Sequence, residues 1–357
     1  MKALVLAGGR GTRLRPITFT RAKQLVPVAN KPILFFAIEA IRDAGITDVG
    51  VVVGDTATEV MAALGDGSRW GIRITYIPQE APLGLAHAVR IAEDFLGGER
   101  FVMYLGDMLI ASGIARFVEE FRAGDFDAQL LLGDVDTRDT TEFGIVELGS
   151  DGSVVRLHEK PAVAPSNLAL VGVYLFNHRI IEAVNAIAPS ARGELEITDA
   201  IQWLVDHGGK VGPHVVEGWW KDTGRLDDLL EANRIVLDAL EPEQLSAPGP
   251  GTALHGRVSI GRDTVIEDSL VRGPAIIGDG CEIRGAYIGP YTAIGDACRV
   301  VGSEIEHSIL LKESRVENIG ARLADSLLGV NATVHRSESR QAAVQAMIGD
   351  NSEVNLL

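Results

Sequence analysis

Apolar runs alternate with helix-like patterns through the first two thirds of the chain. Between the early runs, apolar residues recur every three or four positions and a glycine follows, as is typical of helix ends. Six apolar runs predict buried strands: Lys2–Ala7, Asp48–Val53, Ile72–Ile77, Phe101–Leu105, Ala128–Leu132 and Leu168–Phe176. The stretches that predict helices are Ile33–Ala44, Thr56–Leu64 and Leu85–Phe95. Strands that alternate with helices predict βαβ units, a mainly parallel α/β sheet, and a ligand site where its strands end.

A different pattern begins after residue 253. One aliphatic residue recurs at a spacing of 17 positions, at Ile260, Ile277, Ile294, Leu311 and Leu328. A repeat of about six residues inside a longer period predicts a parallel β-helix, in which each coil stacks its aliphatic side chain on the coil below. The coil that starts at Leu311 is irregular, because Lys312, Arg315 and Glu317 fall where other coils have small or apolar residues. The two cysteines, Cys281 and Cys298, occupy equivalent positions and are predicted to be small core residues.

The segment between the two patterns, residues 241–253, is rich in proline and glycine and predicts a linker. A length of 357 residues also fits two domains better than one. We therefore expect an α/β domain over residues 1–240, a linker over 241–253, a β-helix over 254–336 and a tail over 337–357. The flat apolar face of stacked coils predicts either self-association into a homo-oligomer or packing back on the α/β domain.

Basic residues gather at the start of an acidic chain. The first 38 residues contain seven Lys or Arg and no Asp or Glu, although the whole chain has a formal net charge of −16. A glycine-rich turn, residues 8–11, follows the first predicted strand, and Arg10, Arg13, Arg15 and Lys23 lie in or after it. Glycines expose backbone N–H groups to anionic oxygens. The pattern predicts a binding site for a polyphosphate or a sugar phosphate.

Bulk properties exclude several classes of partner. A hydrophobic content of 46% and a mean hydropathy of +0.15 are typical of a folded globular protein. No segment approaches the roughly 18 apolar residues of a membrane span, and the first apolar run is too short for a signal peptide. Two cysteines agree with a reducing compartment. We therefore expect a cytoplasmic protein that does not bind a membrane. Because the net charge is strongly negative, we also expect no nucleic acid polymer as partner.

Two carboxylates lie at positions suited to a metal ion. Asp107 ends an apolar strand, where it is either a helix N-cap or a metal ligand, and Asp222 lies beside a tight glycine turn. Two carboxylates together with substrate phosphates are a typical way to hold Mg²⁺. A third candidate, Lys160, precedes a proline and is expected on a loop, although a surface ion pair is the simpler interpretation of that position.

Several motifs together resemble the sugar-1-phosphate nucleotidylyltransferases. They are Gly8-Gly9-x-Gly11-Thr12-Arg13-Leu14-x-Pro16, Lys23 with Pro27-Val28-x-x-Lys31-Pro32, Arg192-Gly193-Glu194-Leu195-Glu196 and Trp220-x-Asp222-Thr223-Gly224. The likeness covers nearly the whole chain and is greatest to the long-form glucose-1-phosphate thymidylyltransferases of that family. It implies a Rossmann-like mixed sheet with nucleotidyltransferase activity, followed by a left-handed β-helix of hexapeptide-like repeats. The implied reaction is Mg²⁺-dependent in-line attack of glucose 1-phosphate on the α-phosphorus of dTTP, which gives dTDP-glucose and pyrophosphate.

The resemblance also implies roles for individual residues. Those implied to bind the nucleotide are Gly8, Gly9, Gly11, Thr12, Arg13, Gln79 and Gly84, of which Gln79 and Gly84 read the base. Those implied to bind the sugar phosphate or shape its pocket are Gly144, Glu159, Lys160, Leu170, Tyr174, Arg192, Glu194 and Trp220. Asp107 and Asp222 are implied to bind Mg²⁺. The implied catalytic residues are Arg13, Lys23, Asp107 and Lys160, with Lys23 placed against the α-phosphate.

One position departs from the family pattern, and several alternatives stay open. Met108 stands where the family usually has Asn, which leaves the identity of the hexose less secure than the type of reaction. UTP in place of dTTP, or a different hexose, is one alternative. A hexapeptide-repeat acyltransferase using His255, His307 or His335 is another, and a non-catalytic sugar-nucleotide sensor is a third. A dinucleotide-binding fold is disfavoured, because Leu14 occupies the position of its third glycine.

Overall fold

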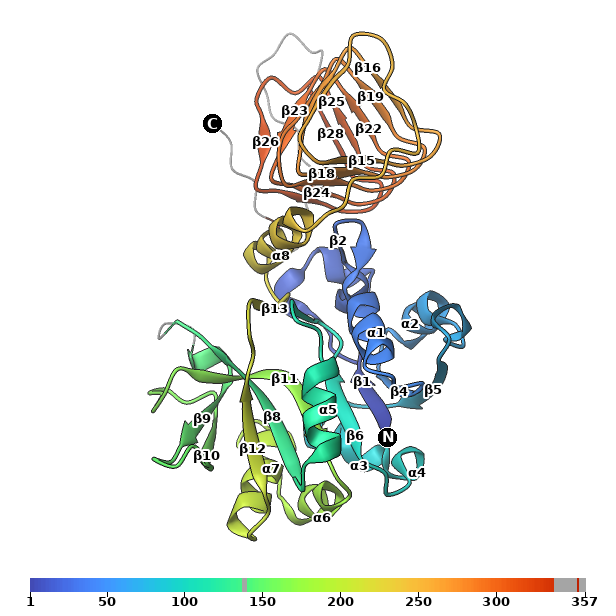
Figure 1. Ribbon diagram of the computed structural model, residues 1–357. Helices are drawn as coiled ribbons and strands as arrows, with labels where there is room; N and C mark the ends of the chain where they lie inside the picture. Colours follow the sequence, from blue (N-terminus) through green and yellow to red (C-terminus); the bar gives the residue numbers. More distant parts are fainter. Residues whose placement is uncertain (137–139, 337–351, 353–357) are drawn as a thin grey trace. The chain divides into compact units, whose positions relative to one another are not determined.

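The structure is a computed structural model that describes residues 1–136, 140–336 and 352 (Figure 1). The expected tail over 337–357 therefore lies outside the described residues, apart from residue 352. The chain forms two compact units that are interleaved along the sequence. The first, the sheet unit, consists of Met1–Arg10, Arg21–Leu25 and Ile33–Asp222. The second, the β-helix unit, consists of Gly11–Thr20, Val26–Pro32 and the chain from Thr223 onward. The predicted domain limits at 240 and 253 stay a prediction.

A nine-stranded mixed sheet forms the centre of the sheet unit, which confirms the expected Rossmann-like mixed fold. Its strands are β1 (Lys2–Leu6), β4 (Asp48–Val53), β5 (Arg73–Pro78), β6 (Phe101–Leu105), β8 (Ala128–Asp134), β9 (Gly144–Leu148), β10 (Val154–Glu159), β11 (Leu168–Phe176) and β12 (Val211–Val215). The order runs β10-β9-β11-β6-β1-β4-β5, with β8 beside β11 and β12 beside β8. Strand β1 is parallel to β4 and β6, whereas β11 is antiparallel to β6 and β8.

Helices pack on both faces of this sheet because its strands are apolar on both faces. Alternate residues of β1 point to opposite sides, so Val5 joins one core and Leu4 the other. The helices that contribute to the first core are α1 (Ile33–Asp43), α2 (Ala57–Leu64) and α5 (Ala115–Ala123). Those that contribute to the second are α3 (Leu85–Ile91), α4 (Glu93–Leu96), α6 (Arg179–Ala186) and α7 (Ile197–Asp206). The short 3-10 turns of this unit are η3 (Lys23–Leu25), η4 (Ser68–Trp70) and η5 (Thr140–Glu142).

One predicted helix is divided in the structure. The stretch Leu85–Phe95 forms two helices that meet at Ala92, where the backbone N–H bonds to Val89 O at 3.1 Å instead of continuing the α-helical pattern. A separate two-stranded ribbon of β7 (Met108–Ile110) and β13 (Trp220–Asp222) is antiparallel, and it places Asp222 opposite Met108. No helix among the described residues is long and apolar enough to cross a membrane.

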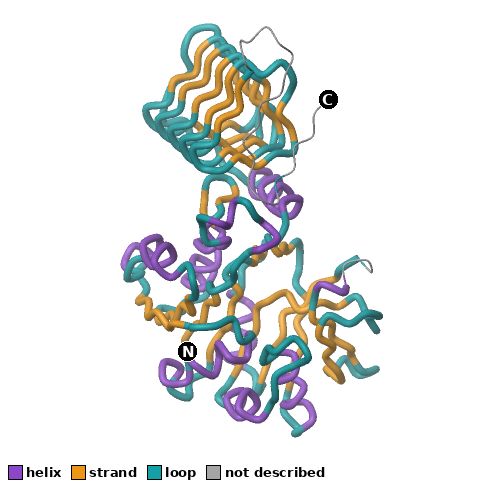
Figure 2. Tube along the Cα trace, turned by 180° about the vertical axis from the view of Figure 1, so that it is seen from behind, coloured by secondary structure: helices purple, strands orange, loops and turns teal. Residues whose placement is uncertain are grey.

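Three parallel five-stranded sheets make up the β-helix, as the repeat predicted (Figure 2). The first sheet contains β14 (Ala253–His255), β17 (Leu270–Arg272), β20 (Tyr287–Ile288), β23 (Glu304–Glu306) and β26 (Leu323–Ala324). The second contains β15 (Val258–Ile260), β18 (Ala275–Ile277), β21 (Thr292–Ile294), β24 (Ile309–Leu310) and β27 (Leu327–Leu328). The third contains β16 (Val265–Glu267), β19 (Glu282–Arg284), β22 (Arg299–Val301), β25 (Arg315–Glu317) and β28 (Thr333–His335). This stacking is consistent with the expected left-handed β-helix.

The pairing of the coils corrects one detail of the predicted repeat. Ile294 pairs with Leu310 and not with Leu311, so the coil that begins at Ile294 is one residue shorter than the predicted spacing, and the coil that begins at Leu310 is one residue longer. Val316, which is fully buried, therefore takes the inward position assigned to Glu317. A shift of one residue exchanges the two faces of a strand, and here it turns the charged Arg315 and Glu317 away from the core.

The two cysteines lie in the core of the β-helix as free thiols. The Cys281 Sγ donates to Gly295 O at 3.1 Å, and the Cys298 Sγ donates to Leu311 O at 3.2 Å. Burial raises the pKa of the Cys281 thiol to about 12 and also raises that of Cys298. Both side chains are therefore protonated at neutral pH, as packed core residues are expected to be.

A part of the amino-terminal sequence packs within the β-helix unit. Besides the coils, this unit contains helix α8 (Leu226–Asp238), the hairpin of β2 (Pro27–Val28) and β3 (Lys31–Pro32), and the turns η1 (Thr12–Leu14) and η2 (Ile17–Phe19). Asn233 on α8 is fully buried and accepts from the Ala29 N–H at 2.8 Å, while its Nδ2 donates to Tyr291 O at 2.9 Å. One amide thus connects the hairpin, α8 and a coil of the β-helix.

We expect the change Asn233→Ala to destabilise the β-helix unit. It leaves the Ala29 N–H and the Tyr291 carbonyl without this partner, at about 1–3 kcal/mol for each buried group. Urea unfolding of the full chain measures the loss. Asn185→Ala, at an exposed position of α6, is the matched control and is expected to leave stability within about 0.5 kcal/mol. Equal midpoints for the Asn233 variant and the unmodified protein would contradict the bridging role.

Candidate active site

A pocket of about 260 Å³ lies in the sheet unit, where β1, β4 and β6 end. Its lining includes seven of the residues that the sequence singled out: Gly8, Gly9, Lys23, Gln79, Gly84, Asp107 and Glu194. The remaining lining residues are Leu6, Gln24, Val52, Pro82, Leu85 and Leu105. Carboxyl ends of parallel strands form the usual ligand edge of such a sheet. The structure therefore brings these widely spaced residues to the edge at which a ligand was expected.

An ion pair between Lys23 and Asp107 lies in the wall of this pocket. Lys23 begins the turn η3, and Asp107 lies between β6 and β7. The two side chains are only 14% and 15% exposed, so each charge is largely withdrawn from water. A charge in such a position needs a partner, because desolvation of a single ion is costly. The pairing fixes the ammonium group at the edge of the sheet, where an anionic ligand can reach it.

The second predicted metal ligand, Asp222, comes close to Asp107 through the ribbon of β7 and β13. Asp222 lies opposite Met108, the residue directly after Asp107. No cluster of three or more His, Cys, Asp and Glu side chains suited to a metal occurs among residues 1–136, 140–336 and 352. Two carboxylates fit Mg²⁺ nevertheless, since this ion takes few protein ligands and completes its shell with water and substrate oxygens.

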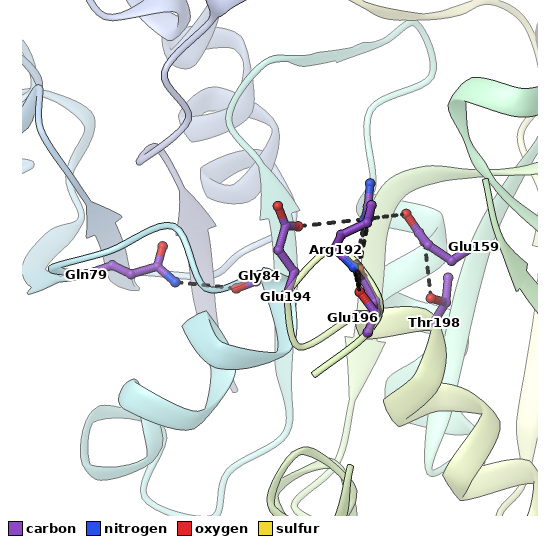
Figure 3. Close-up of polar contacts among 8 residues, drawn as sticks. Gln79, Gly84, Glu159, Arg192, Glu194, Glu196 and Thr198 are labelled. Carbon is purple, nitrogen blue, oxygen red and sulfur yellow. Dashed lines mark hydrogen bonds and ion pairs between the residues drawn. The ribbon is translucent and has the colours of Figure 1, made fainter. Parts of the chain in front are cut away.

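A buried carboxylate holds Arg192 in a fixed orientation (Figure 3). The Arg192 Nη2 donates to Glu196 Oε2 at 2.8 Å and to Glu159 Oε1 at 3.0 Å, and it lies 3.7 Å from Glu194 Oε2. Thr198 donates its hydroxyl to Glu159 Oε2 at 3.1 Å. Burial first, and the charge of Glu196 second, raise the pKa of Glu159. The Arg192 guanidinium group thus lies among the carboxylates of Glu159, Glu194 and Glu196.

Of the residues implied to shape a sugar pocket, some lie beside Glu159 and others pack against aromatic side chains. A Cβ added to Gly144 would lie 2.8 Å from Leu170 Cδ1 and 3.5 Å from Glu159 Oε2, so these three residues are neighbours. Tyr174 is 3% exposed and stacks against Phe176, and burial raises the pKa of its phenol. The remaining member, Trp220, packs edge-on against Phe143. Their roles toward a sugar stay predictions.

Four other predicted residues lie outside these contacts. Lys160 follows β10 with a positive φ of 42°, and its N–H donates to Phe143 O at 3.1 Å. The other three, Gly11, Thr12 and Arg13, belong to the β-helix unit, where Thr18 donates its hydroxyl to Gly11 O at 2.6 Å. Their roles toward a nucleotide stay predictions as well.

The sequence analysis missed Glu196, Thr198 and Gln24 as site residues. Glu196 is 4% exposed, and its spacing of four residues from Arg192 was the available signal for the pair. Gln24 lines the pocket and is 2% exposed, and its Oε1 accepts no hydrogen bond from any described residue. A buried polar atom of this kind usually has a partner, and here a ligand in the pocket could supply it.

The Gly84 backbone begins α3 and requires glycine. Its φ is +104°, and an added Cβ would collide with the Leu195 carbonyl and amide. The flanking chain is fixed from both sides, because the Leu195 N–H donates to Leu83 O at 2.8 Å and the Ala86 N–H donates to Leu195 O at 3.0 Å. These hydrogen bonds, where Leu195 lies across the start of α3, hold Gly84 and Leu85 at the pocket that Gln79 also lines.

Comparisons with known proteins show the family of this chain. The family described as Nucleotidyl transferase matches residues 2–239. A glucose-1-phosphate thymidylyltransferase of Streptomyces antibioticus is 54% identical over 357 residues, which are 100% of this chain and 99% of the relative. One of Streptomyces griseus is 51% identical over 356 residues, with 100% of this chain and 99% of the relative covered.

A solved structure from Bacillus anthracis, described as a glucose-1-phosphate thymidylyltransferase in complex with sucrose, has the same fold. It matches with a TM-score of 0.63 and 35% identity, and the match covers 68% of this chain and 98% of that one. The family model spans most of the sheet unit, and the two Streptomyces relatives match the chain from end to end. The chain therefore belongs to the nucleotidyl transferase family.

Proposed function

We propose that this chain is a glucose-1-phosphate thymidylyltransferase, which converts dTTP and α-D-glucose 1-phosphate into dTDP-glucose and pyrophosphate. The observation that supports this most is the pocket at the strand ends, where a glycine turn and a paired lysine and aspartate meet. The end-to-end similarity to two enzymes of that name supports the choice of substrates. A cytoplasmic location and a homo-oligomeric state stay predictions.

In the proposed reaction, a phosphate oxygen of the sugar attacks the α-phosphorus of dTTP in line, and pyrophosphate leaves. Such transfers depend on positioning and on neutralising charge more than on covalent help from the protein. The amides of Gly8 and Gly9 can donate to phosphate oxygens, and Arg13 adds positive charge for the triphosphate. The Lys23 ammonium neutralises the charge that grows on the α-phosphate as the new bond forms.

A divalent metal is the cofactor that this family generally uses, and we propose Mg²⁺ here. Asp107 and Asp222 would hold it, and the ion would supply charge neutralisation and a fixed orientation for the phosphates. Asp107 also restrains the Lys23 ammonium. In this proposal, the Asp107 carboxylate both pairs with Lys23 and binds the Mg²⁺ ion.

The network around Arg192 suits the second substrate. Lys160 and Arg192 provide positive charge for the sugar phosphate, while Glu159 and Glu194 can accept hydrogen bonds from sugar hydroxyls. Glu196 keeps the Arg192 guanidinium in place through contacts of 2.8 and 2.9 Å. A fixed cation can orient the attacking phosphate without losing side-chain freedom when the sugar binds.

The proposed substrates are tested by a pyrophosphate-release screen. Four nucleoside triphosphates are each combined with the 1-phosphates of glucose, mannose, galactose and N-acetylglucosamine. We expect the highest kcat/KM with dTTP and glucose 1-phosphate, and measurable turnover with UTP, because one methyl group provides only about 1–3 kcal/mol of discrimination. No release with any pair that contains glucose 1-phosphate would contradict the proposal.

Removal of the pocket cation is expected to reduce the chemical step. Lys23→Ala should lower kcat by about 100- to 1000-fold, as the loss of one preorganised charge donor typically does. Steady-state turnover at saturating dTTP measures the effect. The control is Lys210→Ala, since Lys210 is 65% exposed and its ammonium group pairs with the exposed Asp125 at the surface. Near-normal turnover of the Lys23 variant would contradict its assigned role.

Neutralising Asp107 is expected to change the response to metal. Asp107→Asn keeps the size of the side chain but removes the charge, so activity should fall and the Mg²⁺ concentration for half-maximal activity should rise at least tenfold. The measurement is a Mg²⁺ titration of residual turnover, with Asp151→Asn at an exposed turn as the control. An unchanged titration midpoint would show that Asp107 is not a metal ligand.

A further inference from the structure

The side-chain amide of Gln79 is held through its nitrogen. The Nε2 donates to Gly84 O at 3.3 Å and lies 3.0 Å from His87 Nδ1 (Figure 3 shows the contact with Gly84). A backbone carbonyl can only accept, so the end of the amide that faces Gly84 must be the NH₂ group. The orientation of this amide therefore follows from its contacts, although oxygen and nitrogen have nearly the same shape.

The oxygen of the same amide faces the pocket. A Cβ added to Gly8 would lie 3.7 Å from Gln79 Oε1, and both Gly8 and Gln79 line the pocket. In this orientation the pocket wall presents a hydrogen-bond acceptor. If the amide turned by 180° about its last bond, the wall would present two N–H donors instead.

His87 provides the stronger of the two contacts that prevent this rotation. Gly84 O already accepts the Ala88 N–H at 3.3 Å as part of α3, so its long contact with Gln79 is shared. The contact of 3.0 Å with His87 Nδ1 is shorter, and it requires a ring nitrogen without a proton. Burial, together with the charge of Arg90, lowers the pKa of His87. A neutral ring at pH 7 is therefore the form that can accept from Gln79.

We propose that His87 is a positioning residue for recognition of the base: it accepts from Gln79 Nε2 and thereby keeps Gln79 Oε1 turned toward the nucleotide. Thymine and uracil have an N–H donor at ring position 3, which this oxygen can accept. Cytosine has a lone pair at the same position, which would meet the oxygen with repulsion. The inference rests on the proposed function, because it requires that the pocket receive a pyrimidine nucleotide.

The alternative is that His87 only fills space in the first turn of α3. A packing role would weaken binding of every nucleotide to a similar degree, since loosening of α3 does not distinguish bases. A positioning role instead changes the ratio between dTTP and dCTP. It also predicts rescue by asparagine, because an Asn Oδ1 can occupy the place of His Nδ1 and accept the same hydrogen bond.

The experiment measures the dissociation constants of dTTP and dCTP for the full chain by titration calorimetry. We expect His87→Leu to reduce the preference for dTTP over dCTP by about tenfold, in line with the loss of one oriented hydrogen bond. His87→Asn is expected to keep the preference within about threefold of the unmodified protein. In a Gln79→Ala background, His87→Leu should produce no further change. His87→Ala replaces the leucine variant if the latter unfolds.

Three results would overturn the inference: an unchanged preference in His87→Leu, an equal loss in His87→Asn, or the same loss in the Gln79→Ala background. Pyrophosphate release by the unmodified protein separates this inference from the proposed function. Release from dTTP and glucose 1-phosphate with an unchanged preference refutes only the role of His87. Absence of both release and dTTP binding refutes the proposed function and this inference together.

Discussion

The ion pair between Lys23 and Asp107 is the interaction on which the site depends. Two charges that are about one-seventh exposed would each be unfavourable alone, and together they are held at the ends of the central strands. An anionic substrate can replace part of this pairing without moving the ammonium group back into water. The enzyme therefore meets its substrate with the positive charge already desolvated, a condition under which electrostatic stabilisation is strong.

The strands that end at the pocket are packed into two cores at once, one on each face of the sheet. Residues of β1 alternate between the core to which α1, α2 and α5 contribute and the core to which α3, α4, α6 and α7 contribute. A shift of this strand would disturb both layers, so its carboxyl end, and with it Gly8 and Gly9, has one position. The crossing of Leu195 with the start of α3 fixes Gly84 in the same way from the other side.

The central sheet and the β-helix followed directly from the hydrophobic pattern. Strands Asp48–Val53, Phe101–Leu105 and Leu168–Phe176 have the predicted bounds, because all but one residue of each strand is buried and their sequences are mostly apolar. The edge strand β10 and its neighbour β9 were not predicted, since only two residues of each are buried and the apolar signal is broken. The short coil that begins at Ile294 escaped a count at fixed spacing, because a coil one residue longer follows it.

The site was predictable to the extent that its residues follow strands. Asp107 and the glycine turn were visible for that reason, and Lys23 was visible in the run of basic residues near the amino terminus. His87 and Gln24, in contrast, act through side chains whose contacts form only in the folded chain. Sequence spacing gives no direct measure of such contacts. The buried amide of Gln24 is the clearest case, because nothing in its surroundings along the chain distinguishes it from a core residue.

The interleaving of the two units has a consequence for how this protein can be divided. Arg21–Leu25, which includes Lys23, is joined at both ends to segments of the β-helix unit, Gly11–Thr20 and Val26–Pro32. Asn30 donates to Ile294 O at 2.7 Å, so the second of these segments uses a coil as its support. Deletion of the coils would remove this contact from Val26–Pro32, the segment that directly follows Lys23 and its neighbours. The carboxyl-terminal third of the chain thus supports an amino-terminal loop, and a cut between the two units along the sequence would divide this support from the loop.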